Sequence, residues 1–395
     1  MSPMRYVDQL DVEGRRVLLR VDLNVPLHDG SVEDDTRILA VLPTINYILD
    51  NGGMAIVMSH LDRPGGKRVA GLSLRPVAER LSEILATEVT FVDEIVGPAA
   101  TSAAERMRPG SIVMLENLRF DKGEESNDEA FSKSLASLAD IYVDDAFANA
   151  HRSHASNVGV TRHMEECCGG LLMKRELKAL EGALESPKRP LVVAIGGAKV
   201  SSKIDVLENL ARVADRLLLG GAMAFPFLRA QGLEVGDERF DGAAEEKARR
   251  ILESDAAKAL VIPEDFVIST MDGGVETVAV SRMPDGAQPL DIGPRTIEQF
   301  VNEIKGAGTI VWNGPMGMFE KEEFSAGTRS IAKAIADASA FSLAGGGDTG
   351  SAVDRYELRQ RISYVSTGGG AFLEKLAGRQ LPGIEALEDP EFIRS

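Results

Sequence analysis

The sequence predicts an α/β protein with two doubly wound, parallel-sheet (Rossmann-like) domains joined by a hinge helix. Three observations support this: the length of the chain, the alternation of short apolar runs with helical patterns, and the glycine and charged residues that follow those runs. A length of 395 residues exceeds what one hydrophobic core usually organises, so two domains are expected.

The apolar runs are short, and several are continuous rather than alternating, which is typical of strands buried on both faces of a parallel sheet. The candidate strands begin at Arg15, Ala55, Val89, Ser111 and Ile141 in the first half, and at Pro190, Arg216, Ala259, Thr309, Phe341 and Ser363 in the second. A strongly amphipathic segment, 171–186, follows the CCGG sequence at 167–170. We therefore expect domains over 1–168 and 169–375, with this helix between them.

The net charge of −17 argues against nucleic acid or an anionic membrane as a partner, although a local basic cluster can still bind a small anion. No apolar run approaches the ~20 residues that span a bilayer, and the N-terminus does not resemble a signal peptide. The two cysteines, Cys167 and Cys168, are adjacent, which favours a reducing cytoplasm over a disulfide. We expect a cytoplasmic monomer.

Glycine-rich segments follow five candidate strands of the second half. They lie at 196–197, 220–221, 314–317, 345–347 and 368–370. Glycine lets backbone N–H groups approach a phosphate closely, and a following helix presents its positive end. A single such segment is most simply a tight turn, but five at one sheet edge indicate a phosphate-binding cradle.

Two lysines and one aspartate accompany the glycines. Lys199 and Lys203 are four residues apart and share a face if a helix begins there, so that both could reach one nucleotide. Two solvated lysines are the simpler interpretation of that spacing alone. Asp348 follows three glycines, where it could hold Mg²⁺ bound to phosphates or act as a helix N-cap, and both roles are compatible.

Gly345, Gly347 and Gly350 also match the GxGxxG dinucleotide fingerprint, so an NAD-dependent dehydrogenase is the alternative. That function requires an acidic residue at the end of the next strand to hold the ribose. The next candidate strand ends in Ser-Thr-Gly-Gly-Gly without an acid, which argues against this alternative.

Cationic and polar residues gather at predicted strand ends of the first half. They are Arg20, Asp22, Asn24, Arg37, His60, Arg63, Arg119, His151 and Arg152. Arginine suits a bidentate grip on carboxylate or phosphate, whereas any single one is also explained as a surface ion pair. The spacing of His151 and His154 allows a zinc site, but neither a cysteine nor a third histidine lies nearby in the sequence. Together the two halves indicate phosphoryl transfer between a nucleotide and a small acidic substrate.

In order and composition, these motifs resemble those of the phosphoglycerate kinase family. The matching segments are RVDLNVP (20–26), SHLDRP (59–64), LENLRF (115–120), DAFANAHRSHAS (145–156), GGAKVSSK (196–203), WNGPMGMFE (312–320), GGGDT (345–349), STGGGAF (366–372) and LPGIEAL (381–387). The resemblance covers essentially the whole chain. It implies reversible transfer from the acyl phosphate of 1,3-bisphosphoglycerate to Mg-ADP, giving 3-phosphoglycerate and ATP.

By position in the motifs, the resemblance implies two sets of ligand-binding residues. Phosphoglycerate would bind Asp22, Asn24, Arg37, His60, Arg63, Arg119 and Arg152. Nucleotide would bind Lys199, Lys203, Gly293, Glu320, Gly346, Gly347, Asp348 and Thr349, with Glu320 on the ribose and Asp348 on the metal. Arg37, Lys199 and Lys203 would be the catalytic residues. A nucleotide-binding protein without catalysis is a further alternative, but it would not need both lysines, Arg37 and Asp348.

Four positions depart from common forms of the family pattern. Asp62 and Ala148 stand where glycine is usual, Ser202 where aspartate is usual, and Ala222 where a third glycine is frequent. None removes a charge-bearing site residue, so they bear on substrate affinity and not on the reaction class. The segment 376–395 is expected to return to the first domain, as it does in the family.

Overall fold

The computed structural model describes residues 4–198, 200–233, 235, 242–270, 273–284 and 287–388. The chain divides into two compact units, Met1–Leu177 with Gln380–Ser395, and Lys178–Arg379. The chain therefore passes between the units twice. The domain ranges expected from the sequence remain predictions, and the first border between units lies several residues further along the chain. Within the described ranges, no helix is long and apolar enough to cross a membrane.

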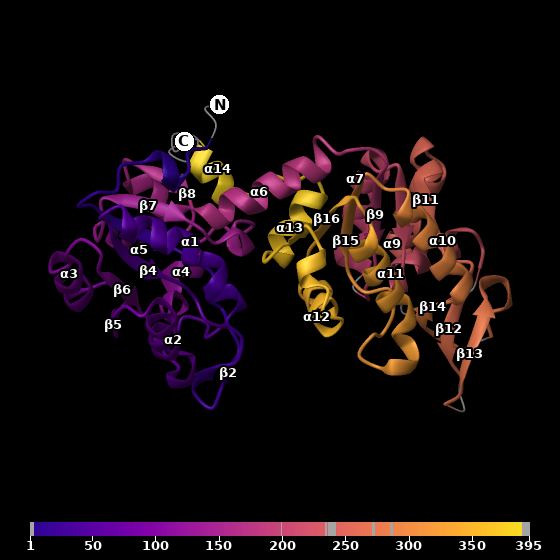
Figure 1. Cartoon of the computed structure of the whole chain (residues 1–395), viewed down its shortest axis with the longest axis horizontal. Helices are drawn as coiled ribbons and strands as arrows, with labels where there is room; N and C mark the ends of the chain where they lie inside the picture. The colour runs from indigo at the N-terminus through magenta and orange to yellow at the C-terminus, as the bar shows by residue number, and fades with distance from the viewer. Residues whose placement is uncertain are drawn as a thin grey trace. The chain divides into compact units, whose positions relative to one another are not determined.

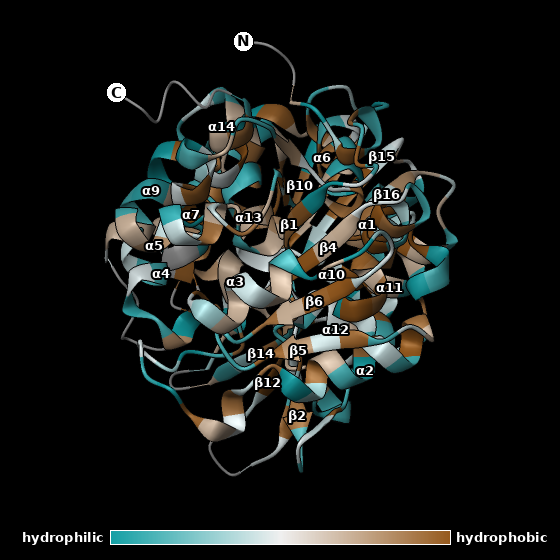
Figure 2. Cartoon of the chain, turned by 90° about the vertical axis from the view of Figure 1, so that its left-hand side faces the viewer, coloured by the Kyte–Doolittle hydropathy of each residue, from teal (hydrophilic) through white to brown (hydrophobic). Residues whose placement is uncertain are grey.

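The first unit is built on a six-stranded parallel sheet in the order β5-β6-β4-β1-β7-β8 (Figure 1). Its strands are β1 (Arg16–Arg20), β4 (Met54–Met58), β5 (Val89–Val92), β6 (Ile112–Leu115), β7 (Ile141–Asp144) and β8 (Cys167–Gly169). The helices of this unit are α1 (Thr36–Asp50), α2 (Arg75–Leu85), α3 (Pro98–Glu105), α4 (Lys122–Ser126) and α5 (Glu129–Ala136). Residues of β1 and β4 are almost wholly buried, as the continuous apolar runs predict. In Figure 2, β4 and β6 are brown along much of their length, whereas α2 carries teal.

The second unit repeats this plan with a parallel sheet in the order β11-β10-β9-β15-β16-β17. Its strands are β9 (Leu191–Ile195), β10 (Arg216–Leu219), β11 (Leu260–Val261), β15 (Thr309–Asn313), β16 (Phe341–Ala344) and β17 (Tyr364–Val365). The helices are α7 (Val200–Val213), α8 (Phe225–Ala230), α9 (Gly242–Leu252), α10 (Pro294–Lys305), α11 (Ala326–Asp337), α12 (Gly347–Arg355) and α13 (Gly369–Leu376). The prediction of two doubly wound parallel sheets is confirmed.

Two helices lie at the passages between the units. The amphipathic segment forms α6 (Leu171–Leu184), which begins directly after β8, and α14 (Pro382–Glu388) contacts β8. Short 3-10 turns complete the described structure. They are η1 (Val7–Gln9), η2 (Ala70–Leu72), η3 (Leu118–Phe120), η4 (Phe147–Asn149), η5 (Gly159–His163), η6 (Gly221–Ala224), η7 (Asp255–Ala259), η8 (Val280–Arg282), η9 (Glu322–Phe324) and η10 (Arg359–Arg361).

Some strands were not predicted. A three-stranded antiparallel sheet, β13-β12-β14, is formed by Val275–Ala279, Asp265–Ser269 and Gln288–Ile292. A small hairpin pairs β2 (Leu27–His28) with β3 (Ser31–Val32), and β8 lies in a segment interpreted only as a boundary. Strand β13 is mostly exposed, and β2, β3 and β8 are too short to show a period, so their sequences lack the signal that marks a buried strand.

The strand orders place a switch point in each sheet. In the first sheet β4 and β7 flank β1, and in the second β10 and β15 flank β9. In open α/β sheets, ligands bind beyond the carboxyl ends of the strands near such a point. Ligands are therefore expected beside the residues that follow β1, β4 and β7 in the first sheet, and β9, β15 and β16 in the second.

Candidate active site

Predicted residues of the first unit follow neighbouring strands at one sheet edge. Asp22 and Asn24 follow β1, and His60 follows β4, with Asp22 and His60 buried. Arg37 stands in the first turn of α1 and forms an ion pair with the Asp22 carboxylate. Among the described residues, Arg37 forms no ion pair with Asp34 or Asp35, its near neighbours in the sequence.

Asp35 is instead bound by Arg80, whose Nε lies 2.9 Å from one carboxylate oxygen and Nη2 2.5 Å from the other. Asp34 accepts a hydrogen bond from the Thr36 amide at 2.8 Å. Both neighbouring acids are thus engaged elsewhere, and the Arg37 guanidinium is directed to the sheet edge.

The Asp22 carboxylate is charged despite its burial. Burial by itself would raise its pKa, but the charges of Arg37 and Arg20 and a hydrogen bond from the Asn24 amide outweigh burial and hold the pKa at about 2. Asn24 in turn accepts a hydrogen bond from the Asp62 amide at 2.8 Å. Asp22 and Asn24 are therefore fixed in place as hydrogen-bond acceptors at this edge.

His60 is held neutral by its surroundings. Its pKa lies well below the usual range, first because the ring is buried and also because Arg20 and Arg119 are close, with Asp22 opposing them. Arg20 Nη2 lies 3.2 Å from His60 Nδ1. A guanidinium is only a donor, so Nδ1 accepts and the ring proton lies on Nε2.

Three further arginines were predicted from strand ends: Arg63, Arg119 and Arg152. Arg119, in η3, is buried, and its Nη1 donates to the Asp62 carbonyl at 2.6 Å. Burial, together with the charges of Arg152 and Arg20, lowers the Arg119 pKa, although Glu125 opposes them. Such a concentration of positive charge is suited to the binding of an anion.

Arg63 is exposed and Arg152 is half-buried. Across the described part of the chain, neither guanidinium makes a hydrogen bond or ion pair. Both are therefore available to a ligand.

The sequence did not predict the buried hydrogen-bond network that lies behind this edge. Arg20 Nε donates to Ser156 Oγ at 2.9 Å, and Ser156 Oγ donates to the buried carboxylate of Glu124 at 2.7 Å. His154 Nδ1 also lies 3.6 Å from Glu124, so this histidine serves the network and not a metal. No group of three or more His, Cys, Asp or Glu able to hold a metal ion is found among the described residues.

In the second unit, Lys203 lies at the switch point. Its Nζ donates to the carbonyl of Gly196, after β9, at 2.9 Å. A Cβ built on Gly314, after β15, would lie 3.0 Å from the same Nζ. The ammonium is therefore close to both strand ends. Lys199 lies outside the described residues, so the predicted shared face of the two lysines is not observed.

The glycines of this edge approach one another closely. A Cβ on Gly196 would lie 2.0 Å from the Pro315 carbonyl, and a Cβ on Gly314 would lie 2.2 Å from the Gly196 carbonyl. These segments pack backbone against backbone, which a side chain would prevent. The glycine cluster thus forms one connected surface after β9 and β15.

The segment after β16 begins α12. Gly346, with φ +104°, is the N-cap, and Asp348 lies within the first turn, so the N-cap role considered for Asp348 is wrong. Thr349 Oγ1 accepts a hydrogen bond from the Gly314 amide at 2.7 Å, which joins this turn to the segment after β15. Asp348 is exposed, and its carboxylate makes no hydrogen bond or ion pair in the part of the chain that is described.

Gly293 and Glu320 flank β14 rather than the parallel sheet. Gly293 is the N-cap of α10, and a Cβ there would lie 2.3 Å from Asp265 Cγ. Glu320 is exposed, in a loop whose Met318 amide donates to the Leu290 carbonyl at 2.7 Å. The structure places both near one strand but shows no contact between them.

Comparison with known proteins decides the family. The phosphoglycerate kinase family model matches residues 7–379. A phosphoglycerate kinase of Thermosipho africanus is 47% identical over 98% of this chain and 99% of its own, and one of Desulfosudis oleivorans is 49% identical with the same coverage. The structure of phosphoglycerate kinase from Coxiella burnetii has a TM-score of 0.88 at 40% identity, covering 98% of this chain and 99% of that one.

The chain belongs to the phosphoglycerate kinase family. It is a phosphotransferase of glycolysis that moves a phosphoryl group reversibly between 1,3-bisphosphoglycerate and ADP. The dehydrogenase alternative is not favoured, and β17 is followed by Ser366 rather than by an acid.

The departures from the family pattern can now be placed. Asp62 adopts φ +53°, a conformation that glycine adopts without strain. Ala148 lies in η4 and Ala222 in η6, both in regular backbone conformations, and the side chain of Ser202 lies outside the described residues.

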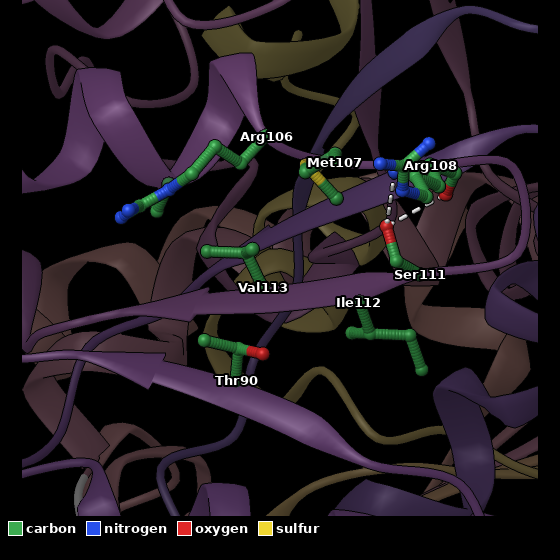
Figure 3. Close-up of a pocket in the computed structure, with 8 residues that line it drawn as sticks. Thr90, Arg106, Met107, Arg108, Ser111, Ile112 and Val113 are labelled. Carbon is green, nitrogen blue, oxygen red and sulfur yellow. Dashed lines mark hydrogen bonds between the residues drawn. The ribbon is translucent and has the colours of Figure 1, made fainter.

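A separate hollow of about 380 Å³ lies beside the amino end of β6, away from the carboxyl edge. Figure 3 shows Thr90, Met107 and Val113 at this hollow, with Arg106 and Arg108 on either side. Its lining includes no acid or histidine and lies away from the carboxyl ends of the strands, so we do not assign the active site to it.

Proposed function

We propose that the carboxyl edge of the first sheet binds the phosphoglycerate substrate. The proposed residues are Asp22, Asn24, Arg37, His60, Arg63, Arg119 and Arg152. The observation that carries the proposal is a set of cations in a chain of net charge −17. Among the described residues Arg63 and Arg152 form no ion pair, and the charge of Arg152 lowers the pKa of the buried Arg119. His60, protonated on Nε2, supplies a neutral hydrogen-bond donor for a carboxylate or phosphate oxygen.

The nucleotide is proposed to bind at the carboxyl edge of the second sheet. Lys203 and the glycine segments after β9, β15 and β16 would contact the phosphates, together with Lys199 and the turn at Gly346, Gly347, Asp348 and Thr349. Gly293 and Glu320, which flank β14, would hold the nucleoside, with Glu320 on the ribose. The position of Lys203 Nζ between two glycine segments supports this assignment.

Mg²⁺ is the proposed cofactor, held as Mg-ATP or Mg-ADP by Asp348. The carboxylate in the first turn of α12 is exposed and has no partner among the described residues, which fits such a role, because Mg²⁺ usually takes one or two carboxylates and completes its shell with phosphates and water. When bound, the ion neutralises negative charge on the phosphates. Asp348→Asn should raise the magnesium concentration needed for half activity, and an unchanged magnesium titration would contradict this role.

Phosphoryl transfer requires the positioning of the two reactants and the neutralisation of charge on the transferring group, and it does not require a general base. An ADP oxygen, already ionised, attacks the phosphorus of the acyl phosphate, and the bond to the carboxyl oxygen breaks. Arg37 and Lys203 would neutralise charge on the transferring group. We further propose that the units close to bring the ligands together and exclude water, and that the protein is a cytoplasmic monomer binding neither nucleic acid nor membrane.

The two ligand sites are tested separately by calorimetry. Lys203→Ala should weaken Mg-ADP binding and leave 3-phosphoglycerate binding within about twofold, while Arg63→Ala should do the reverse, because each removes a cation from one site only. The reaction is followed from 3-phosphoglycerate and Mg-ATP by trapping the acyl phosphate with hydroxylamine. Equal loss of both ligands in either variant would overturn the assignment of one ligand to each unit.

A further inference from the structure

The start of α6 is capped by residues that lie far away in the sequence. The Leu171 amide donates to Thr44 Oγ1 at 2.9 Å, and the Met173 amide donates to Asp145 Oδ1 at 2.9 Å. Thr44 Oγ1 donates in turn to Asp145 Oδ2 at 2.5 Å. The first amides of a helix have no partner inside the helix, so these two side chains supply the cap.

The same network joins α6 to the face of α1 that carries Arg37. Arg37 and Thr44 are seven residues apart, which puts them on one face of α1 and two turns apart. Arg37 pairs with Asp22, which follows β1, and Thr44 binds Asp145, which follows the neighbouring strand β7. Helix α1 is therefore attached at two points to the edge where the substrate is proposed to bind.

Further contacts tighten this junction. Arg175 of α6 donates from Nη2 to the Ala40 carbonyl of α1 at 2.9 Å. Pro43 lies inside α1 and cannot donate a helical hydrogen bond, so the alignment of the helix depends more on such outside contacts. A Cβ on Gly170 would lie 2.2 Å from Asp145 Cγ, which shows how closely the backbone before α6 passes that carboxylate.

We propose that Thr44 and Asp145 are positioning residues for phosphoryl transfer, through which the start of α6 sets the placement of α1 and hence of Arg37. Neither touches substrate. The helix that leads along the chain to the nucleotide-binding unit begins in their hydrogen bonds, so a change at that helix is transmitted to the arginine. The proposal rests on the catalytic role proposed for Arg37.

The variant that tests this is Thr44→Val, which keeps the shape of the buried side chain and removes the hydroxyl. We expect kcat to fall at least about tenfold while the dissociation constant for 3-phosphoglycerate stays within about twofold, because misplacement of a catalytic group impairs turnover more than binding. Thr44→Ser restores the hydroxyl and should recover most of kcat. If Thr44→Val does not fold, Thr44→Ala removes the same hydroxyl.

Thr161→Val is the matched control. Thr161 is equally buried in the same unit and donates a hydrogen bond to the Val158 carbonyl at 2.8 Å, but among the described residues it makes no hydrogen bond to α6 or α1. Thr161→Val should lower the melting temperature about as much as Thr44→Val does, but it should leave kcat unchanged. Wild-type kcat in Thr44→Val, or equal loss in Thr44→Ser or in Thr161→Val, would overturn the proposal. If Arg37→Ala also kept wild-type kcat, the failure would lie in the role of Arg37 instead.

Discussion

At the scale of single residues, Arg37 and Arg63 separate transition-state stabilisation from ground-state binding. Arg37 is fixed on α1 by Asp22, whereas Arg63 is exposed and unpaired among the described residues. We expect Arg37→Ala to lower kcat by roughly 10³-fold with a smaller effect on 3-phosphoglycerate affinity, because a positioned arginine acts on charge that develops during transfer. Arg63→Ala should mainly raise KM. Steady-state kinetics with a thermal melt as control tests both, and wild-type kcat in Arg37→Ala would refute the role assigned to it.

Asp62 offers a second residue-scale prediction. Its exposed carboxylate stands beside the cationic edge, while its backbone amide and carbonyl hold Asn24 and Arg119. Asp62→Gly and Asp62→Asn should each lower KM for 3-phosphoglycerate severalfold at low ionic strength, because each removes a like charge from an anion site and suits the left-handed backbone. The gain should shrink as salt is added. A KM that is unchanged at low salt in both variants would show that this charge does not reach the substrate.

At the scale of elements, the sequence predicted the strands of the two parallel sheets except β8, because continuous apolar runs carry a strong signal, and it predicted that the candidate site residues follow these strands. It did not predict Glu124 or the cap formed by Thr44 and Asp145. Glu124 lies in a polar segment that resembles any exposed helix, and its burial arises only through Arg20 and Ser156, distant in sequence. The partners of Asp145 are likewise distant in sequence. They are Thr44 of α1 and the Met173 amide of α6, which come together only when β7, α1 and α6 pack.

Two carboxylates mark the ends of β7 and have opposite effects on stability. Asp140 directly precedes the strand, and Asp144 is its last residue. Burial raises the pKa of Asp144 from 3.8 to about 7, and its Oδ2 has no hydrogen-bond partner among the described residues. Hydrogen bonds from Arg16 lower the pKa of Asp140. A raised pKa means that the folded state retains a proton that the unfolded chain releases, so the contribution of Asp144 is present below pH 3.8 and is lost as the pH rises to about 7.

Asp144→Asn should therefore flatten the fall in stability of the first unit between about pH 4 and pH 7, by at most about 4 kcal/mol for a shift of about three units. The amide keeps the oxygen that accepts from the Ala146 amide at 2.9 Å. Asp140→Asn should instead lower stability at neutral pH and leave that slope in place, because its contribution is lost only at low pH. Hydrogen exchange of the β1 and β7 amides against pH measures both, and an unchanged slope in Asp144→Asn would contradict the prediction.

At the scale of the whole molecule, the chain returns from the second unit to the first at Gln380. The segment that follows packs on the first unit. Leu381, Ile384 and Leu387 are buried, and the Gly383 amide donates to the Ala150 carbonyl at 2.9 Å. Ala150 directly precedes His151 and Arg152 of the proposed substrate edge. The C-terminal segment thus attaches beside the residues that are proposed to bind phosphoglycerate.

Removal of residues 381–395 should impair turnover more than the binding of either ligand. Each unit keeps the ligand-binding residues proposed for it, but α13, which belongs to the second unit, loses the chain segment that leads back to the first unit. The first unit should also lose stability, since fully burying one such apolar side chain contributes about 1.5–3 kcal/mol. Kinetics well below the melting temperature, with calorimetry for both ligands, separate the two effects.

A chain that ends at Glu388 is the matched control, because it retains the whole of α14 with Leu381, Ile384 and Leu387. It should keep the turnover of the full chain, which would assign the loss in the longer truncation to the docked helix and not to the residues after it. Gly383→Ala gives a graded test, since the new Cβ would lie 3.1 Å from the Ala150 Cα and displace the segment without deleting it. Its turnover should fall between those of the two truncations. Full activity in the chain lacking 381–395 would show that this second tether does not take part in catalysis.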